Sequence, residues 1–379
     1  MQRPVRLGVV GLGSVAQRGL LPHLTEPDLK PLVELVAVCD AVADRARATA
    51  AKYGVPRWYS EYAEMLADDA LEAVVIATPI PLHFEQAMAA VRAGKHVHLN
   101  KAMTTTKEEA DRLLAAAKDA GVKLVASPGQ MLRPAYRTVR RLVSEGAVGK
   151  VFFAIHGMSF VGHEHEGFRR GDDVLSDVDP AWYYQRGGGP MYDMGVYCLH
   201  AITGILGPVR RVTGMSALAL PEREFKGRRL SVEMDDNTLL LLDFGQGTFA
   251  YIYATNSYGG TGLSVYGERG AIVARRRSGV ELNGQDVAVD GSMPYHWGRH
   301  PELPEAHVYS DIMHLVDCIR TDREPVVSGE HARHVIEVIE KGYVAARTGQ
   351  TQEIASTFAS PPEISAWGPL AAPEGAGDR

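Results

Sequence analysis

The sequence predicts an α/β protein, with a doubly wound parallel sheet in its first part and an α+β unit with a large, mostly antiparallel open sheet in its second. Two observations predict this fold. Up to about residue 128, short apolar runs alternate with helical stretches, as in strands joined by right-handed crossovers. Beyond that point the apolar runs follow one another closely, as in hairpins. Since 379 residues exceed one usual core, we expect domains at 1–128 and 129–350, and a tail or surface arm at 351–379.

In the first part, apolar runs predict strands at residues 5–10, 35–39, 73–77, 96–99 and 123–126. Helices are predicted between them, at residues 15–24, 41–53, 81–94 and from Thr106 to Gly121. Thr106 and Glu109 have the spacing of a capping box, and Gly54 suits a left-handed helix end.

In the second part, strands are predicted at residues 151–158, 209–219, 238–244, 247–253, 264–267 and 271–274. The segment Gly245-Gln246-Gly247 is typical of a hairpin turn. Helices are predicted at residues 133–145, 306–320 and 330–347, and we expect them on one face of the sheet.

The composition excludes several functional classes. The chain has 46 acidic and 40 basic side chains, and its net charge of −6 indicates neither nucleic acid nor an anionic membrane as partner. Cys39, Cys198 and Cys318 are odd in number and far apart, which favours a reducing compartment over a disulfide framework. There is no apolar stretch of membrane-spanning length and no signal-peptide pattern. We therefore expect a cytoplasmic protein.

A glycine-rich turn after the first predicted strand indicates a dinucleotide site. Residues 11–16 (GLGSVA) match the G-x-G-x-x-G/A fingerprint of a Rossmann domain, in its required position between strand and helix. The predicted contacts are Gly11, Gly13, Ser14, Val15 and Ala16. Asp40, at the end of the second strand, can bind a ribose 2′-hydroxyl and would repel a 2′-phosphate, so NAD is favoured over NADP. The alternative role of Asp40 is a helix N-cap.

Three further segments carry a resemblance to a known family: residues 77–83 (ATPIPLH), 94–102 (GKHVHLNKA) and 187–197 (GGGPMYDMGVY). With the glycine-rich turn, they resemble the glucose-fructose oxidoreductase / inositol dehydrogenase / MocA (Gfo/Idh/MocA) family from about residue 5 to 210, and more loosely to about 350. The chain departs from the family pattern where Asn100 and Ala102 replace its usual Glu and Pro. Tyr197 replaces the commoner histidine, as in the glucose-fructose oxidoreductase and dihydrodiol dehydrogenase branches.

The resemblance implies an NAD(P)-dependent oxidoreductase that transfers a hydride between nicotinamide and a hydroxyl or keto carbon of a sugar, sugar derivative or cyclitol. It implies catalytic or substrate-contacting roles for Lys101, Asp193 and Tyr197. Further cofactor contacts are implied at Thr78, Pro79, His83, Asn100 and Lys101. Family members are commonly dimeric or tetrameric, and the open sheet face suits such a homo-oligomer.

The chemistry of alcohol oxidation gives these residues roles. It needs a base, and free tyrosine, with a pKa of about 10, is a poor one. A nearby lysine favours phenolate, so Tyr197 is the expected acid/base, assisted by Lys101. Asp193 lies four residues before Tyr197 on a helix that Pro190 can start, and it can orient Lys101 or accept a substrate hydroxyl. Each residue also has a structural alternative: a solvated lysine, a carboxylate at a helix N-terminus and a core tyrosine.

Six residues are weaker candidates for substrate contact: Gln130, His163, Trp182, Tyr184, Arg186 and His200. The aromatic and basic residues 179–186 suit a pocket wall or an ordinary amphipathic loop, and His200 suits a proton relay or a bonded helix histidine. The run His163-Glu164-His165-Glu166 lacks the spacing of a helical zinc site, so we expect no metal.

Two other functions remain open. One is an enzyme that keeps its cofactor and uses transient oxidation for glycoside cleavage or elimination. The family that the chain resembles includes such enzymes. The other is a non-catalytic, NAD-sensing regulator, which the altered Asn100 and Ala102 suggest.

Overall fold

The first sheet is parallel and confirms the doubly wound prediction. A computed structural model describes residues 3–275, 279–362 and 364–373. The strand order is β3-β2-β1-β4-β5-β6. The strands are β1 (Val5–Val10), β2 (Val33–Cys39), β3 (Arg57–Tyr59), β4 (Ala73–Ile76), β5 (His96–Leu99) and β6 (Leu124–Ala126). Strand β3 was not predicted, because its three residues are half-buried or exposed and form no apolar run.

Apart from the short helix at Tyr62–Leu66, which was not predicted, the helices of this part follow the sequence signals. They are η1 (Ala16–Leu20), α1 (Leu21–Leu24), α2 (Ala43–Tyr53), α3 (Tyr62–Leu66), α4 (His83–Arg92) and α5 (Lys107–Asp119). The first predicted helix begins as a π-helical turn, η1, and continues as α1. The capping box is confirmed, because Glu109 N donates to Thr106 Oγ1 at 3.2 Å and Thr106 N donates to Glu109 Oε2 at 3.2 Å. Gly54 ends α2 with a left-handed φ of 67°.

The second sheet has nine strands in the order β16-β15-β14-β13-β7-β12-β11-β8-β17, and only β7 and β12 pair in parallel. The strands are β7 (Val151–Ser159), β8 (Arg211–Ala217), β11 (Asn237–Gly245), β12 (Thr248–Thr255), β13 (Gly260–Gly267), β14 (Gly270–Ala274), β15 (Val280–Leu282), β16 (Gln285–Val287) and β17 (Gln352–Glu353). Gly245 pairs with Thr248 across the predicted hairpin turn. The mostly antiparallel prediction is therefore confirmed.

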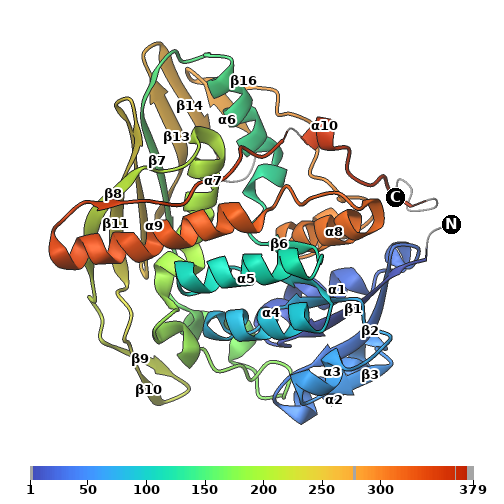
Figure 1. The fold of residues 1–379 in the computed structure, drawn as a ribbon. Coiled ribbons are helices and arrows are strands. Elements are labelled where there is room, and N and C mark those ends of the chain that lie inside the picture. Colours follow the sequence, from blue (N-terminus) through green and yellow to red (C-terminus); the bar gives the residue numbers. More distant parts are fainter. Residues whose placement is uncertain (1–2, 276–278, 363, 374–379) are drawn as a thin grey trace.

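Helices cover one face of this sheet and leave the other open. Helices α6 (Pro134–Ser144), α7 (Val196–Leu206) and α9 (Gly329–Thr348) pack against it, with α9 crossing beside β8 (Figure 1). The open face carries exposed apolar side chains from neighbouring strands: Met215, Leu239, Leu241, Phe249 and Tyr266.

One helix from late in the chain belongs to the first sheet's core. Helix α8 (Ala306–Thr321), which the sequence interpretation assigned to the second part, packs against β5 and β6. Its Ile312, Leu315 and Val316 share one buried cluster with Leu7 of β1 and Val125 of β6.

The last segment returns across the molecule. It adds β17 to the edge of the large sheet and then runs to α10 (Ile364–Trp367), which lies above α8 in the view of Figure 1. Trp367 packs in the same buried cluster as α8. Residue 363 and residues 374–379 of the predicted arm lie outside the described part.

The remaining elements are short. They are η2 (Pro27–Leu29), η3 (Ile80–Leu82), η4 (Gln130–Leu132), η5 (His163–His165), η6 (Gly167–Arg169), η7 (Ala181–Tyr184), η8 (Met191–Gly195), η9 (His300–Glu302) and the hairpin β9 (Glu222–Phe225)–β10 (Arg228–Ser231). Within the described residues, no helix is both long and apolar enough to cross a bilayer.

Replacing the helix cap, in Thr106→Ala, should lower the free energy of unfolding by about 1 kcal/mol, because Glu109 N loses its acceptor. Urea unfolding, with fluorescence as the signal, measures this loss. Thr351→Ala, at an exposed residue beyond α9, is the matched control and should leave the midpoint unchanged. Equal midpoints for Thr106→Ala and Thr351→Ala would show that the cap contributes nothing.

Candidate active site

A cavity of about 1270 Å³ lies at the carboxyl ends of the first sheet's strands and reaches β7 of the second sheet. Its lining includes residues that follow β1, β2, β4 and β5, namely Gly11, Asp40, Thr78 and Asn100, together with His156 and Met158 of β7. Open α/β sheets bind ligands at this edge. Pockets for one small ligand usually measure about 300–1,000 Å³, so this cavity has room for a cofactor and a second ligand.

The glycine-rich turn forms one wall of the cavity and fits a pyrophosphate. Gly11 has a φ of 86°, and a Cβ there would lie 2.6 Å from Thr78 N, so this position needs glycine. Gly13, Ser14 and Val15 line the cavity. They precede or open the first helix, whose leading N–H groups have no partner within the helix and favour anions. The predicted contact Ala16 is buried beneath the turn instead.

Asp40 lies at the cavity rim with both carboxylate oxygens engaged. Oδ2 accepts from Leu12 N at 2.8 Å, and Oδ1 accepts from Val42 N at 2.9 Å and from Arg45 Nη1 at 3.1 Å. The N-cap alternative is wrong, because the N-cap of α2 is Val42 and no side chain caps that helix. The rim therefore presents a carboxylate with a guanidinium directly beside it.

Lys101, Asp193 and Tyr197 come together although they lie far apart in the sequence. Lys101 Nζ donates to the main-chain oxygen of Asp193 at 2.8 Å and to its carboxylate. The same ammonium lies 5.3 Å from the centroid of the Tyr197 ring. Lys101 follows β5, Asp193 belongs to η8 and Tyr197 to the first turn of α7. All three line the cavity.

Charge within this group is strongly coupled. Burial disfavours the ammonium of Lys101, but Asp193 and Tyr197 outweigh it and raise its pKa. Burial likewise opposes the carboxylate of Asp193, yet Lys101 and His163 hold its pKa well below the usual range. Burial raises the pKa of Tyr197 to about 12, while Lys101 acts to lower it. Lys101 and Asp193 are thus a charged pair beside a neutral phenol.

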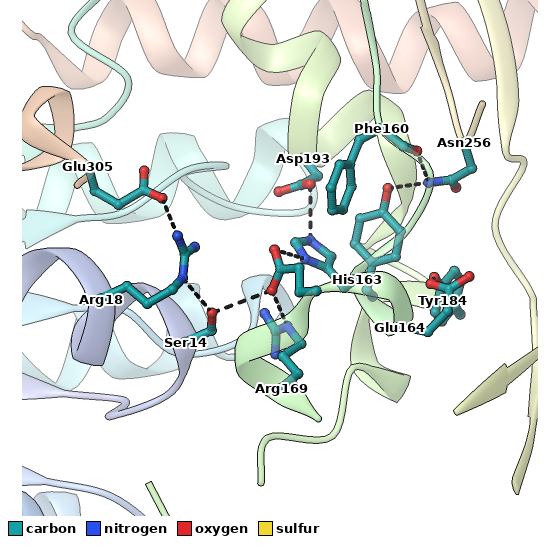
Figure 2. Close-up of polar contacts among 12 residues, drawn as sticks. Ser14, Arg18, Phe160, His163, Glu164, Arg169, Tyr184, Asp193, Asn256 and Glu305 are labelled. Atoms are coloured by element: carbon teal, nitrogen blue, oxygen red, sulfur yellow. Dashed lines mark hydrogen bonds and ion pairs between the residues drawn. The ribbon is translucent and has the colours of Figure 1, made fainter. Parts of the chain in front are cut away.

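His163 extends this group towards the glycine-rich turn, as Figure 2 shows. Its Nε2 lies 3.2 Å from Asp193 Oδ2 and its Nδ1 2.9 Å from Glu166 Oε1. Burial opposes the imidazolium, but Asp193 and Glu166 raise its pKa. Arg169 Nε donates to Glu166 at 2.6 Å. Burial would raise the pKa of Glu166, but His163 and Arg169 lower it to about 2.

The same series of contacts continues to the helix after the glycine-rich turn and from there to Glu305 (Figure 2). Ser14 Oγ donates to Glu166 Oε2 at 3.4 Å and accepts from Arg18 Nε at 3.0 Å. Arg18 also pairs with Glu305 at 3.1 Å. The side chains of Glu305 and Ser14 thus face each other across Arg18.

Of the other predicted contacts, five line the cavity: Thr78, Pro79, Asn100, Gln130 and Trp182. Asn100 is buried, and its Oδ1 accepts from Lys101 N at 2.7 Å. Gln130 Nε2 donates to the main-chain oxygen of Tyr197 at 3.3 Å, while its buried Oε1 has no partner among the described residues.

Besides Ala16, four predicted contacts are not brought to the cavity. His83 lies behind its wall, with its ring nitrogens 2.7 Å and 2.9 Å from the carbonyl oxygens of Ala102 and Thr78. Tyr184 is buried and donates to the Glu164 carboxylate. Arg186 is exposed. His200 is buried against His331, where burial lowers its pKa to about 3.

The run His163-Glu164-His165-Glu166 is divided between two sets of contacts. His163 and Glu166 face the cavity, whereas Glu164 pairs with Arg223 at 3.2 Å on the other side. In the described part of the chain, no group of three or more His, Cys, Asp or Glu side chains is arranged to hold a metal ion.

Two cavity residues that contact this group were not among the predicted site residues. His307 is the second residue of α8, and its Nε2 lies 3.2 Å from Tyr197 Oη. Burial lowers the pKa of His307 to about 3. Glu305 lies 3.8 Å from His307 Nδ1. A histidine in a Pro-containing stretch is only a weak signal, and the contact itself joins residues 110 positions apart.

The comparisons with known proteins agree with this geometry. Residues 5–127 match the model of an oxidoreductase family with an NAD-binding Rossmann fold, and residues 136–273 match that of the GFO/IDH/MocA C-terminal domain. D-apiose dehydrogenase of Paraburkholderia graminis is 26% identical, over 87% of this chain and 86% of its own. The NAD⁺-dependent scyllo-inositol 2-dehydrogenase of Bacillus subtilis is 25% identical, over 89% and 93%.

A solved structure agrees across nearly the whole chain. The aldose-aldose oxidoreductase of Caulobacter crescentus superposes with a TM-score of 0.73 at 25% identity, over 93% of this chain and 100% of that one. The family matches, the strand order and the cavity with its glycine-rich turn together lead to one conclusion. The chain belongs to the Gfo/Idh/MocA family of NAD(P)-dependent sugar and cyclitol oxidoreductases.

Proposed function

We propose that Tyr197 is the acid/base of a dehydrogenase or reductase that acts on a hydroxyl or keto carbon of a sugar, sugar derivative or cyclitol. The observation that carries the proposal is the convergence of Lys101, Asp193 and Tyr197 in the cavity that the glycine-rich turn also lines. The nicotinamide, when bound, supplies the hydride acceptor. The protein's own residues then need only bind the alcohol and move its proton.

In the oxidative direction, the hydroxyl proton passes to phenolate Tyr197 Oη while the carbon's hydrogen leaves with its electron pair, so the carbon becomes a carbonyl. Lys101 favours the phenolate and donates to the reacting oxygen. Asp193 orients Lys101 through the contacts already described. His307, which burial keeps neutral, lies with Nε2 3.2 Å from Tyr197 Oη and positions that oxygen.

Tyr197→Phe should lower kcat/KM by about 10²–10⁴-fold, because the proton loses its acceptor, while NAD binding stays close to wild type. Absorbance of reduced nicotinamide measures turnover on a panel of aldoses, polyols and inositols, and isothermal titration measures NAD binding. Tyr192→Phe is the matched control: its hydroxyl donates to Thr105 O at 2.8 Å, away from Lys101, and turnover should persist.

Turnover by Tyr197→Phe at the wild-type rate would reject the role of Tyr197. NAD binding without turnover of any substrate by the wild type would instead favour the regulator function.

We infer that NAD is preferred over NADP, because the Asp40 carboxylate lies at the rim where the ribose is expected. Asp40→Ser removes this charge and leaves Arg45 without its carboxylate partner, free to pair with a 2′-phosphate. The ratio of kcat/KM for NAD to that for NADP should fall by about tenfold or more. Asp44→Ser, at an exposed carboxylate that pairs with Arg47, is the control and should leave the ratio unchanged. An unchanged ratio in Asp40→Ser would contradict the inference.

A second candidate, an enzyme that keeps its cofactor, is favoured by the segment of residues 163–179, here called the covering segment. A Cβ on Gly13 would lie 3.4 Å from Val178 Cγ1, and Arg45 donates to the carbonyls of Val174 and Asp177 at 3.0 Å and 2.9 Å. The segment therefore lies against both the glycine-rich turn and the Asp40 rim. Such an enzyme would elute from gel filtration with cofactor bound and would give no net nicotinamide reduction.

We also infer a homo-oligomer that buries the open face of the large sheet. At its centre Leu239 lies opposite Tyr253, and Leu241 opposite Tyr251, so apolar side chains form a continuous surface. A second copy of the chain presents the same mainly apolar surface, as a two-fold interface requires. Leu241→Arg should shift the mass measured by light scattering to that of a smaller species. Trp58→Arg, at an exposed residue of β3 in the other sheet, should not. An unchanged mass for Leu241→Arg would reject this interface.

A further inference from the structure

One basic residue in the cavity differs from all the others. Each other lysine or arginine that lines it pairs with a carboxylate: Arg18 with Glu305, Arg45 with Asp40, Lys101 with Asp193, Arg169 with Glu166, Lys226 with Asp177 and Arg228 with Asp179. Arg133 lines the same cavity, and its guanidinium has neither an ion pair nor a hydrogen bond within the described part of the chain. It is half-buried, at the junction of η4 and α6.

Arg133 belongs to the reaction end of the cavity, not to the end that fits the cofactor phosphates. It follows β6, at one edge of the first sheet, whereas the glycine-rich turn and Asp40 follow β1 and β2 nearer the other edge. Its positive charge reaches Tyr197, where it opposes the rise in pKa that burial causes, and His307, where it adds to the fall in pKa that burial causes. The pyrophosphate and the adenosine ribose are therefore not its partners.

The same end of the cavity holds a second group without a partner. Gln130, three residues before Arg133, is buried, and its Oε1 accepts no hydrogen bond from the described residues. A buried amide oxygen is costly to leave unpaired, and a partly desolvated guanidinium favours a counter-charge. The Gln130 oxygen is an acceptor without a donor, and the Arg133 guanidinium is a cation without a counter-charge. Together they indicate a ligand that has hydroxyl donors and an anionic group.

We propose that the substrate is an anionic sugar or cyclitol, whose carboxylate or phosphate pairs with Arg133 while its reacting hydroxyl lies at Tyr197. The planar guanidinium donates two parallel hydrogen bonds, which match two oxygens of either anion. A neutral polyol would leave this cation without a counter-charge. The proposal rests on the proposed function for the reaction at Tyr197, and it adds the substrate's charge class and the residue that selects it.

Matched substrate pairs test this inference. Glucose is compared with glucuronate for a carboxylate and with glucose 6-phosphate for a phosphate, and myo-inositol with its monophosphate. The anionic member of at least one pair should have a wild-type kcat/KM at least tenfold above that of its neutral partner. Arg133→Gln should lower kcat/KM for that anion by about 10–100-fold and for the neutral member by less than about threefold. Arg133→Lys, which keeps the charge but loses the fork, should recover part of the loss.

The control is Arg140→Gln, on the helix that follows Arg133 but outside the cavity lining, which should leave the preference intact. The two anion arms distinguish a carboxylate substrate from a phosphate substrate. Neutral members preferred in every pair, or an equal loss for both members in Arg133→Gln, would overturn the proposal while the dehydrogenase function stands.

A binding measurement separates this inference from the proposed function. Isothermal titration of the NAD-loaded enzyme with glucuronate and with glucose 6-phosphate needs no turnover. Binding of either anion that weakens about tenfold or more in Arg133→Gln supports the anion site even where Tyr197→Phe shows that the proposed chemistry is wrong. Binding of both anions that is equally strong in wild type and Arg133→Gln overturns it.

Discussion

The ion pair between Lys101 and Asp193 is the constraint on which the rest of the site depends. Lys101 follows a strand of the first sheet, and Asp193 lies on the π-helical turn that leads into α7 of the second part, so the pair joins the two parts of the molecule. A buried pair is tolerated when further polar contacts satisfy both members. Here the main-chain oxygen of Asp193 and the imidazole of His163 supply them. Tyr197, one helical turn beyond Asp193, is thereby held over the ammonium.

The charges around the cavity form a linked system. Asp193 serves both Lys101 and His163, His163 also contacts Glu166, and Glu166 contacts the serine of the glycine-rich turn. Each carboxylate in this series of contacts has at least one cationic or hydroxyl partner. The cavity wall can therefore carry many charges without a large net electric field. Arg133 and the Oε1 of Gln130 have no partner among the described residues, and they indicate which groups the ligand must supply.

The sequence predicted the elements with strong local signals and missed contacts between distant residues. The glycine-rich turn, the capping box at Thr106 and the hairpin turn at Gly245 each depend on neighbouring residues, and each formed as expected. Strand β3 was missed because its partners, not its three residues, make it a strand.

Lys101, Asp193 and Tyr197 were found only because their segments resemble a family. His307 and Arg133 belong to no such segment, and their approach to Tyr197 depends on how α8 and α6 pack. His200 was chosen because three-residue spacing places it near Tyr197 on a helix, but α7 is buried on nearly every side and turns this histidine towards α9.

The position of α8 has a consequence for synthesis of the chain. Its Ile312 and Leu315 complete the apolar layer under β1 and β6, so the scaffold of the nucleotide site lacks part of its interior until residues beyond 300 leave the ribosome. During that interval, which spans nearly half of the chain, between Ala126 and Ala306, the newly made parallel sheet exposes the apolar surface that α8 later covers.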